Sequence, residues 1–229
     1  MRRDVSLAIF LTGFFIFLIM LPPAYATPIT IYGNQAGSIN HLANFTATLT
    51  YSYKSSTSAT LTIQLTNSTT GFTAAYLTGF VFNNPNDQIT KISLTNPPGY
   101  TSISLTFSNG KVKSDSSGDF GKFDFGVTVG GSSNPTAGIA MGNTATFTFT
   151  LTGTSLNTLT EQSFVNASSS GGSTFFAAQF SGINPGNKSD NVPGTLNPTA
   201  TPEPGTMLLL ASGIVGLGIC RKMKFKGKG

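Results

Sequence analysis

The sequence predicts an all-β fold, an antiparallel β-sandwich of about nine strands with room for one short helix. Large apolar residues alternate with Thr and Ser in several runs, and this period of two places them on one face of a sheet. The 229 residues include 33 Thr, 25 Ser and 26 Gly, which favour strands and turns over helices. The 19 Phe, with many Val, Ile and Leu, can bury a core, which argues against disorder.

Nine segments are predicted to be strands. The alternation is clearest in residues 45–53, 59–65, 103–107, 123–129 and 145–151. Weaker candidates are residues 29–32, 77–82, 89–95 and 174–180. Clusters of Asn, Pro, Gly and Ser between these segments predict turns.

One short helix is expected over residues 157–167. Thr158 and Glu161 have the spacing of a capping box, in which each side chain bonds to the backbone of the other residue. Leu159 and Phe164 would then face the sheet.

Charged residues make up only 9% of the chain, whereas roughly 25% is usual in a soluble domain. The net charge of +5 comes from the two ends, because residues 27–201 hold six Lys against five Asp and one Glu. Without a cationic face we expect no nucleic-acid partner. One His and one Cys exclude a disulfide and most metal sites built on these residues, and we expect no cofactor.

The first 26 residues have the three parts of a secretory signal peptide, predicted to be helical. Arg2 and Arg3 precede an apolar stretch, and Ala24 and Ala26 form a small-x-small cleavage site. We expect the general secretion machinery to export the chain and signal peptidase to cut after Ala26. An uncleaved membrane anchor is the alternative.

The last 28 residues combine three features in order. An extended segment comes first, because prolines remove backbone donors, and it consists of Pro202, Glu203 and Pro204. A transmembrane helix is expected over about 206–220, followed by a basic tail over 221–229. The basic residues expected to stop transfer across the membrane are Arg221, Lys222 and Lys224.

This tail resembles the PEP-CTERM sorting signal of bacterial surface proteins. The resemblance implies recognition by exosortase, a membrane-embedded processing enzyme, and cleavage near the Pro-Glu-Pro triplet. It also implies a Gram-negative host that makes exopolysaccharide, an inner-membrane precursor, and a mature form at the cell surface or outside the cell. A plain membrane anchor behind a proline-rich linker is the alternative.

The chain therefore divides into four predicted parts. They are a signal peptide (1–26), a β-sandwich ectodomain (27–182), a Pro/Gly-rich stalk (183–201) and a sorting signal (202–229).

Three acidic residues in one predicted hairpin loop are weak calcium candidates, namely Asp115, Asp119 and Asp124. Calcium prefers clustered carboxylates, but the spacing is not that of an EF-hand. Lysines interrupt the cluster, so a solvated loop with partly cancelling charges is the alternative.

We do not expect an enzyme. His41 is the one candidate imidazole base, and no Gly-x-Ser-x-Gly motif surrounds any serine. Nothing in the sequence brings Glu161 close to an Asp for glycosidase chemistry.

The predicted function is that of a non-enzymatic cell-surface or exopolysaccharide-matrix protein, with exopolysaccharide as a candidate partner. The alternative is a carbohydrate-binding or adhesive module on the same sandwich. Sugars stack on exposed aromatic rings, and the chain has no Trp. The candidate platforms are therefore Tyr32, Tyr51, Tyr53, Tyr76 and Tyr100.

Overall fold

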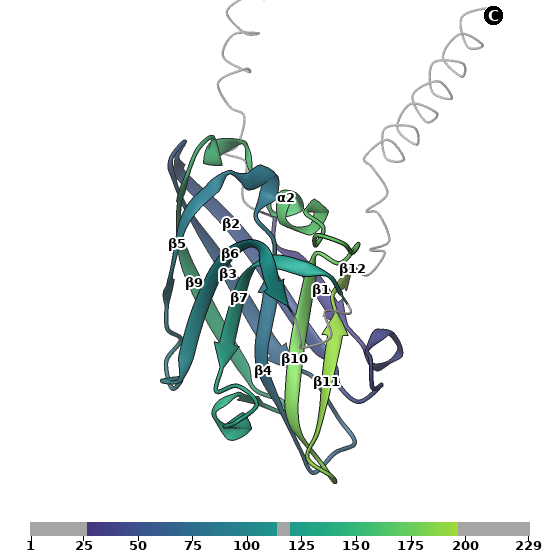
Figure 1. Ribbon diagram of the computed structural model, residues 1–229. Helices are drawn as coiled ribbons and strands as arrows, with labels where there is room; N and C mark the ends of the chain where they lie inside the picture. The colour runs from purple at the N-terminus through teal and green to yellow at the C-terminus, as the bar shows by residue number, and fades with distance from the viewer. Residues whose placement is uncertain (1–26, 114–119, 197–229) are drawn as a thin grey trace, which may run out of the picture.

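Two antiparallel sheets pack face to face in the structure, a computed structural model that describes residues 27–113 and 120–196 (Figure 1). In spatial order, the first sheet consists of β12 (Thr195–Leu196), β1 (Ile29–Gly33), β2 (Phe45–Ser55), β3 (Ser58–Asn67), β9 (Thr144–Gly153) and β5 (Ile89–Thr95). The second consists of β11 (Lys188–Pro193), β10 (Phe176–Asn184), β4 (Ala74–Phe82), β7 (Lys122–Val129) and β6 (Ile103–Lys113), and β8 (Ile139–Ala140) pairs with β4. The predicted all-β sandwich is thus confirmed.

All nine predicted strands are present, and the inward residues follow the alternation except at the end of the run 45–53, where Tyr53 is exposed. Phe45, Ala47 and Leu49 on β2 are buried, while the threonines between them face outward. Burying one such large apolar side chain stabilises the fold by about 1.5–3 kcal/mol. One-sided burial therefore fixes the strand register, because a slip by one residue would expose every core residue of that strand.

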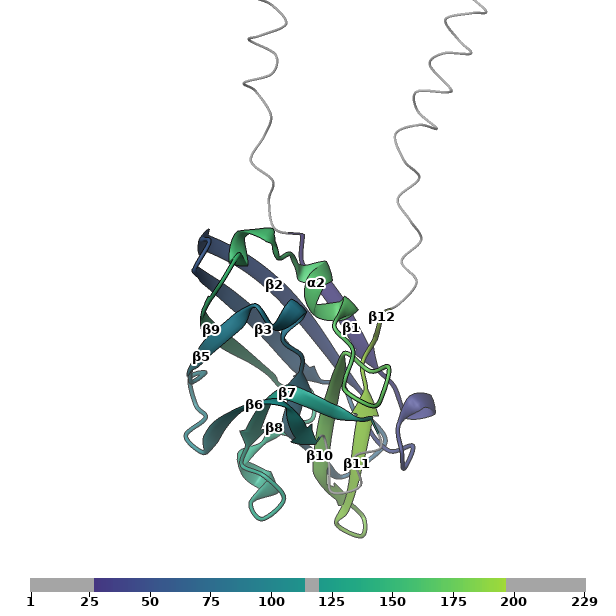
Figure 2. The same ribbon diagram turned by 45° about the horizontal axis from the view of Figure 1, so that its top comes forward.

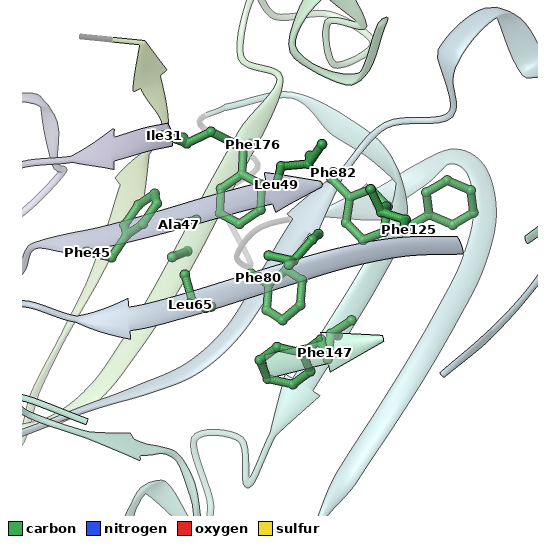
Figure 3. Packing of buried hydrophobic residues seen from close by; sticks show 14 of the residues in the cluster. Ile31, Phe45, Ala47, Leu49, Leu65, Phe80, Phe82, Phe125, Phe147 and Phe176 are labelled. Carbon is green, nitrogen blue, oxygen red and sulfur yellow. The ribbon is translucent and has the colours of Figure 1, made fainter. Parts of the chain in front are cut away.

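Phenylalanines form the centre of the core between the sheets. The ring of Phe80 on β4 lies 4.8 Å from that of Phe147 on β9 and 5.7 Å from that of Phe176 on β10. Phe82 contacts Phe125 within the second sheet, with ring centroids 4.9 Å apart (Figure 3). The Phe80–Phe147 contact joins the two sheets in the edge-to-face geometry that aromatic pairs favour.

The predicted stalk is wrong over residues 183–196. Residues 188–196 form β11 and β12, and Ile183, Asp190 and Val192 are fully buried. The prolines and glycines suggested a linker, but β11 is an edge strand, where proline is tolerated. The sandwich therefore extends at least to Leu196, and residues 197–201 lie outside the described residues.

The predicted helix over 157–167 is present only in part. A 3₁₀ turn, η4 (Leu156–Thr158), precedes a short helix, α2 (Glu161–Asn166), at one end of the sandwich (Figure 2). Thr160 and Ser163 form the capping box in place of Thr158 and Glu161. Leu159 and Phe164 are buried, as predicted. The other 3₁₀ turns are η1 (Gln35–Gly37), η2 (Pro85–Asp87) and η3 (Pro135–Ala137).

The predicted signal peptide, sorting triplet, C-terminal helix and basic tail lie outside the described residues. Across 27–113 and 120–196, none of the helices has the length and apolar character needed to span a bilayer.

Candidate functional site

An open groove of about 560 Å³ lies at the edge of the first sheet where β12, β1 and β2 meet. It combines the exposed side chain of Tyr32 and the buried ring of Phe45 with amide and hydroxyl side chains. Its lining residues are Tyr32, Gly33, Asn34, Asn44, Phe45, Thr46, Ser68, Thr195 and Leu196.

Strand register places the aromatic ring in this groove. Tyr32 pairs with Thr46 on β2 and with Thr195 on β12, and its side chain points outward because Ile31 before it points into the core. The hydroxyl of Thr195 donates to the carbonyl of Tyr32 at 3.0 Å. Tyr32 is 37% exposed, although two neighbouring strands hold its backbone. Its backbone is therefore held in place, and part of its aromatic side chain is accessible to solvent.

Gly33 forms the floor of the groove next to Tyr32. A Cβ atom at Gly33 would overlap the ring of Phe45 and collide with Val192. The position therefore requires glycine, and the buried ring of Phe45 comes up to the groove floor.

Two asparagine amides beside the ring have fixed orientations. Oδ1 of Asn34 accepts a hydrogen bond from the backbone N–H of Gly37 at 3.0 Å. Oδ1 of Asn44 accepts one from the N–H of Gln35 at 2.9 Å. Each amide thus uses its oxygen within the protein, and in the described part of the chain neither Nδ2 has an acceptor. Both Nδ2 groups remain as donors for a ligand.

One buried carboxylate holds the loop that connects β1 to β2 and carries these amides. Asp190 on β11 is fully buried. Its Oδ2 accepts from the hydroxyl of Ser38 at 2.8 Å and from the N–H groups of Leu42 and Ala43 at 2.8 and 3.0 Å. Its Oδ1 accepts from the N–H of Asn40 at 2.9 Å. Four donors from one loop compensate the buried charge and fix the loop over the sheet edge.

The groove opens onto an array of outward-facing side chains on β2, β3 and β9, which we call the threonine face. Register joins them in rows across the sheet, for example Thr50–Thr62–Thr148. Successive strands lie about 4.8 Å apart, and same-face residues along a strand about 6.7 Å apart. The face consists of Thr46, Thr48, Thr50, Thr60, Thr62, Gln64, Thr66, Thr144, Thr146, Thr148, Thr150 and Thr152.

The threonine face is uncharged, and most of its hydroxyls are free. Among these side chains the structure joins only Thr66 and Thr144, whose hydroxyls lie 2.8 Å apart. Two lysines lie at its border, Lys91 on β5, which is paired with Thr152, and Lys54, which is exposed near the end of β2. Among the described residues that make up the groove and the face, none is acidic or basic. The surface therefore offers hydrogen bonds and apolar contacts, and no ion pairs, to a ligand.

The predicted tyrosine platforms separate into different environments. Tyr32 and Tyr53 are exposed, the latter by 58%, whereas Tyr76 and Tyr100 are half-buried. Burial raises the pKa of Tyr100. Tyr51 is only 4% exposed, and its hydroxyl donates to the carbonyl of Leu156 at 2.7 Å, so the prediction that it is a platform is wrong.

Tyr51 also contacts the candidate acid Glu161. Burial, and secondly the charge of Glu161, raise the pKa of Tyr51 to about 12. Oε1 of Glu161 accepts from the backbone N–H of Tyr51 at 2.9 Å, so this carboxylate binds the edge of β2. His41 is exposed, and its Nδ1–H donates to the carbonyl of Gln35 at 2.6 Å.

Of the three calcium candidates, the structure describes Asp124 alone. Its carboxylate accepts from the backbone N–H groups of Asn84, at 2.7 Å, and Gly110, and so joins the turn after β4 to the stretch of β6 where the register with β7 shifts. Asp115 and Asp119 lie outside the described residues. Within 27–113 and 120–196, no three His, Cys, Asp or Glu side chains are grouped so that they could hold a metal ion.

One feature of the sequence indicates the groove beyond the mere presence of a tyrosine. In Ile29-Thr30-Ile31-Tyr32, the alternation places Tyr32 on the polar face, where a large ring is unusual. The other lining residues come from segments far apart in the chain, and only strand pairing brings them together.

The described residues define the class of the protein, an all-β sandwich with a hydroxyl-covered face and a polar groove. The tail defines it further: the family model of the PEP-CTERM protein-sorting motif matches residues 200–222. The resemblance predicted from the sequence is thus confirmed, and the chain carries a PEP-CTERM sorting motif. This motif is recognised by exosortase and implies an exported protein that is processed at the membrane. Neither the curated proteins nor the solved structures yielded a match to the chain.

Proposed function

We propose that the protein is a non-enzymatic component of the cell surface or of an exopolysaccharide matrix, delivered by its C-terminal signal. The observation that carries this proposal is the PEP-CTERM motif at residues 200–222. The chain is made as an inner-membrane precursor, exosortase cuts it near Pro202–Pro204, and the sandwich remains outside the cytoplasm.

The chemistry of the sandwich supports a structural role over catalysis. Glu161 and Asp190 bond to backbone N–H groups, and the imidazole of His41 bonds to a carbonyl. These groups stabilise loops and strand ends. The broad uncharged threonine face suits a hydrated matrix because its hydroxyls can donate to and accept from both water and sugar hydroxyls.

The test is the mass of the protein that reaches the cell surface. In the native host we expect surface material to lack every peptide from Arg221 onward. Glu203→Ala removes the one charge of the triplet and should leave the full-length precursor in the inner membrane. Thr201→Ala, two residues earlier, is the matched control and should be processed normally. Surface protein that still carries the basic tail would identify residues 206–229 as a plain anchor.

The groove favours a second candidate function, a carbohydrate-binding module on the same scaffold. An exposed ring beside fixed amide donors is the combination that distinguishes a sugar site from an inert matrix surface. This function is compatible with the sorting signal, since a surface protein can also bind the polymer around it.

A further inference from the structure

We propose that the groove and the threonine face together bind a neutral, hydroxyl-rich polysaccharide. Tyr32 provides the stacking surface, Asn34 and Asn44 provide directed donors, and the threonine rows contact the continuing chain. This proposal adds a ligand class and a binding site to the proposed surface protein. It rests on the proposed function only for the location at which the protein meets the ligand.

Stacking of a sugar on the ring of Tyr32 is the first proposed contact. A sugar ring has an apolar face of C–H groups and a polar rim of hydroxyls. Tyr32 offers an accessible aromatic face for the former, in a position fixed by pairing on both sides. Because its backbone is already ordered, binding costs little conformational entropy there.

Hydrogen bonds from the amides of Asn34 and Asn44 are the second proposed contact. Their Oδ1 atoms accept from Gly37 and Gln35, and their Nδ2 groups have no acceptor among the described residues, so each amide keeps a donor for a ligand. A neutral sugar hydroxyl accepts such a hydrogen bond. Ser68, Thr46 and Thr195 line the same groove with hydroxyl groups that can both donate and accept. The groove thus presents matching partners for the hydroxyl rim around an apolar ring.

The threonine face indicates a polymer as the ligand. Thr46 belongs both to the groove and to the face, so the two surfaces are continuous. The rows repeat hydroxyl and methyl groups at regular intervals along and across the strands. A chain of sugars repeats the same two kinds of group, and many weak contacts along it add up as in multivalent binding.

The charge distribution selects a neutral polysaccharide over an acidic one. An acidic polymer needs Lys or Arg on the surface, and the described residues of the groove and face include neither. Binding should therefore be nearly independent of salt concentration.

The first experiment measures binding of the full chain, purified in neutral detergent, to polysaccharides immobilised on a sensor. Dextran, mannan and galactan are the neutral probes, and alginate and hyaluronate the acidic ones. We expect binding to at least one neutral probe that persists at high salt. Tyr32→Ala should weaken it by about tenfold. Tyr53→Ala, which removes an exposed tyrosine of the same sheet outside the groove, should change it less than twofold.

The second experiment separates ligand contacts from folding. Asn34→Asp and Asn44→Asp keep the Oδ1 acceptor and remove the Nδ2 donor, so the fold is retained while affinity falls by about fivefold or more. The double variant Thr62→Val/Thr148→Val removes two free hydroxyls, and we expect a decrease of about threefold. Thr128→Val on the outer face of β7 is the control, with unchanged affinity.

Three results would overturn the proposal. They are no binding to any neutral probe, binding to acidic probes alone, and equal affinities for the wild type and Tyr32→Ala. Unchanged affinity in the Thr62/Thr148 variant would remove the threonine face from the site. All these measurements use purified protein, so they are independent of whether the tail is cut in the host.

Discussion

One fully buried carboxylate, that of Asp190, depends on several hydrogen bonds at once. Asp190 forms no ion pair within residues 27–113 and 120–196, and four donors from the β1–β2 loop compensate its burial. Such a group specifies the loop more strongly than an apolar residue does, because each lost bond leaves a buried donor unsatisfied.

Asp190→Asn tests this role. The amide oxygen of the variant can accept from the three groups that bond to Oδ2 of Asp190. Its Nδ2 then faces the N–H of Asn40, and two donors cannot bond to each other. We expect the free energy of unfolding to fall by about 2–3 kcal/mol, measured by chemical denaturation. Asp87→Asn, at an exposed position with positive φ that Asn also tolerates, should change it by less than about 0.5 kcal/mol. Equal effects of the two substitutions would contradict the assignment.

Tyr51 predicts how stability depends on alkaline pH. Its folded pKa of about 12 lies above the ordinary value of 10.0, because burial and the charge of Glu161 disfavour the phenolate. The stability that Tyr51 contributes is therefore fully present below pH 10 and lost as the pH rises through about 12. A phenolate absorbance titration should show a late step that Tyr51→Phe abolishes and Glu161→Gln moves to lower pH. A late step that survives in Tyr51→Phe would belong to another residue.

At the scale of elements, the sequence predicted those strands that bury one face. β2, β3 and β9 alternate without interruption, so their inward residues could be named before the structure was known. β11 could not be predicted in this way. Its sequence Lys-Ser-Asp-Asn-Val-Pro buries a carboxylate and one valine, and the reason for burying Asp190 lies in a loop some 150 residues earlier.

The groove was unpredictable for the same physical reason. Tyr32 could be identified as a candidate from its residue type. Asn34, Asn44 and Thr195 become part of the groove only through the antiparallel pairing of β12, β1 and β2. Periodicity gives the face on which a residue lies and not the residue opposite to it.

Truncation tests the corrected boundary of the sandwich. A fragment ending after Leu196 should unfold cooperatively and give a β-rich circular dichroism spectrum. One ending after residue 182 lacks β11 and β12, so it loses Asp190 and Val192 and exposes the edge of β10. We expect this shorter fragment to aggregate or to be degraded rapidly by protease. Equal stability of both fragments would restore the boundary at 182 and the stalk after it.

At the scale of the whole molecule, both ends of the described chain lie at one edge of the first sheet. Leu196 pairs with Ile31 on β1, and Leu196 also lines the groove. The sorting motif begins a few residues later, because the family model matches from residue 200. The groove and the start and end of the described sandwich are therefore neighbours along one edge, and the processing signal follows within a few residues in the sequence.

The corrected boundary leaves only residues 197–201 between the sandwich and Pro202. Five extended residues span at most about 18 Å, so the proposed cleavage by exosortase takes place close to the folded domain. Deleting 197–201 joins the triplet directly to β12 and should block access to the peptide bonds around Glu203, so that full-length precursor accumulates in the membrane fraction. Replacing the same five residues by Gly and Ser keeps the length and should restore processing, because the spacer contributes distance and not sequence. Immunoblotting of membrane and surface fractions distinguishes the two variants. Normal processing of the deletion variant would show that the sandwich does not limit access, and failure of the Gly/Ser variant would show that exosortase reads residues 197–201 themselves.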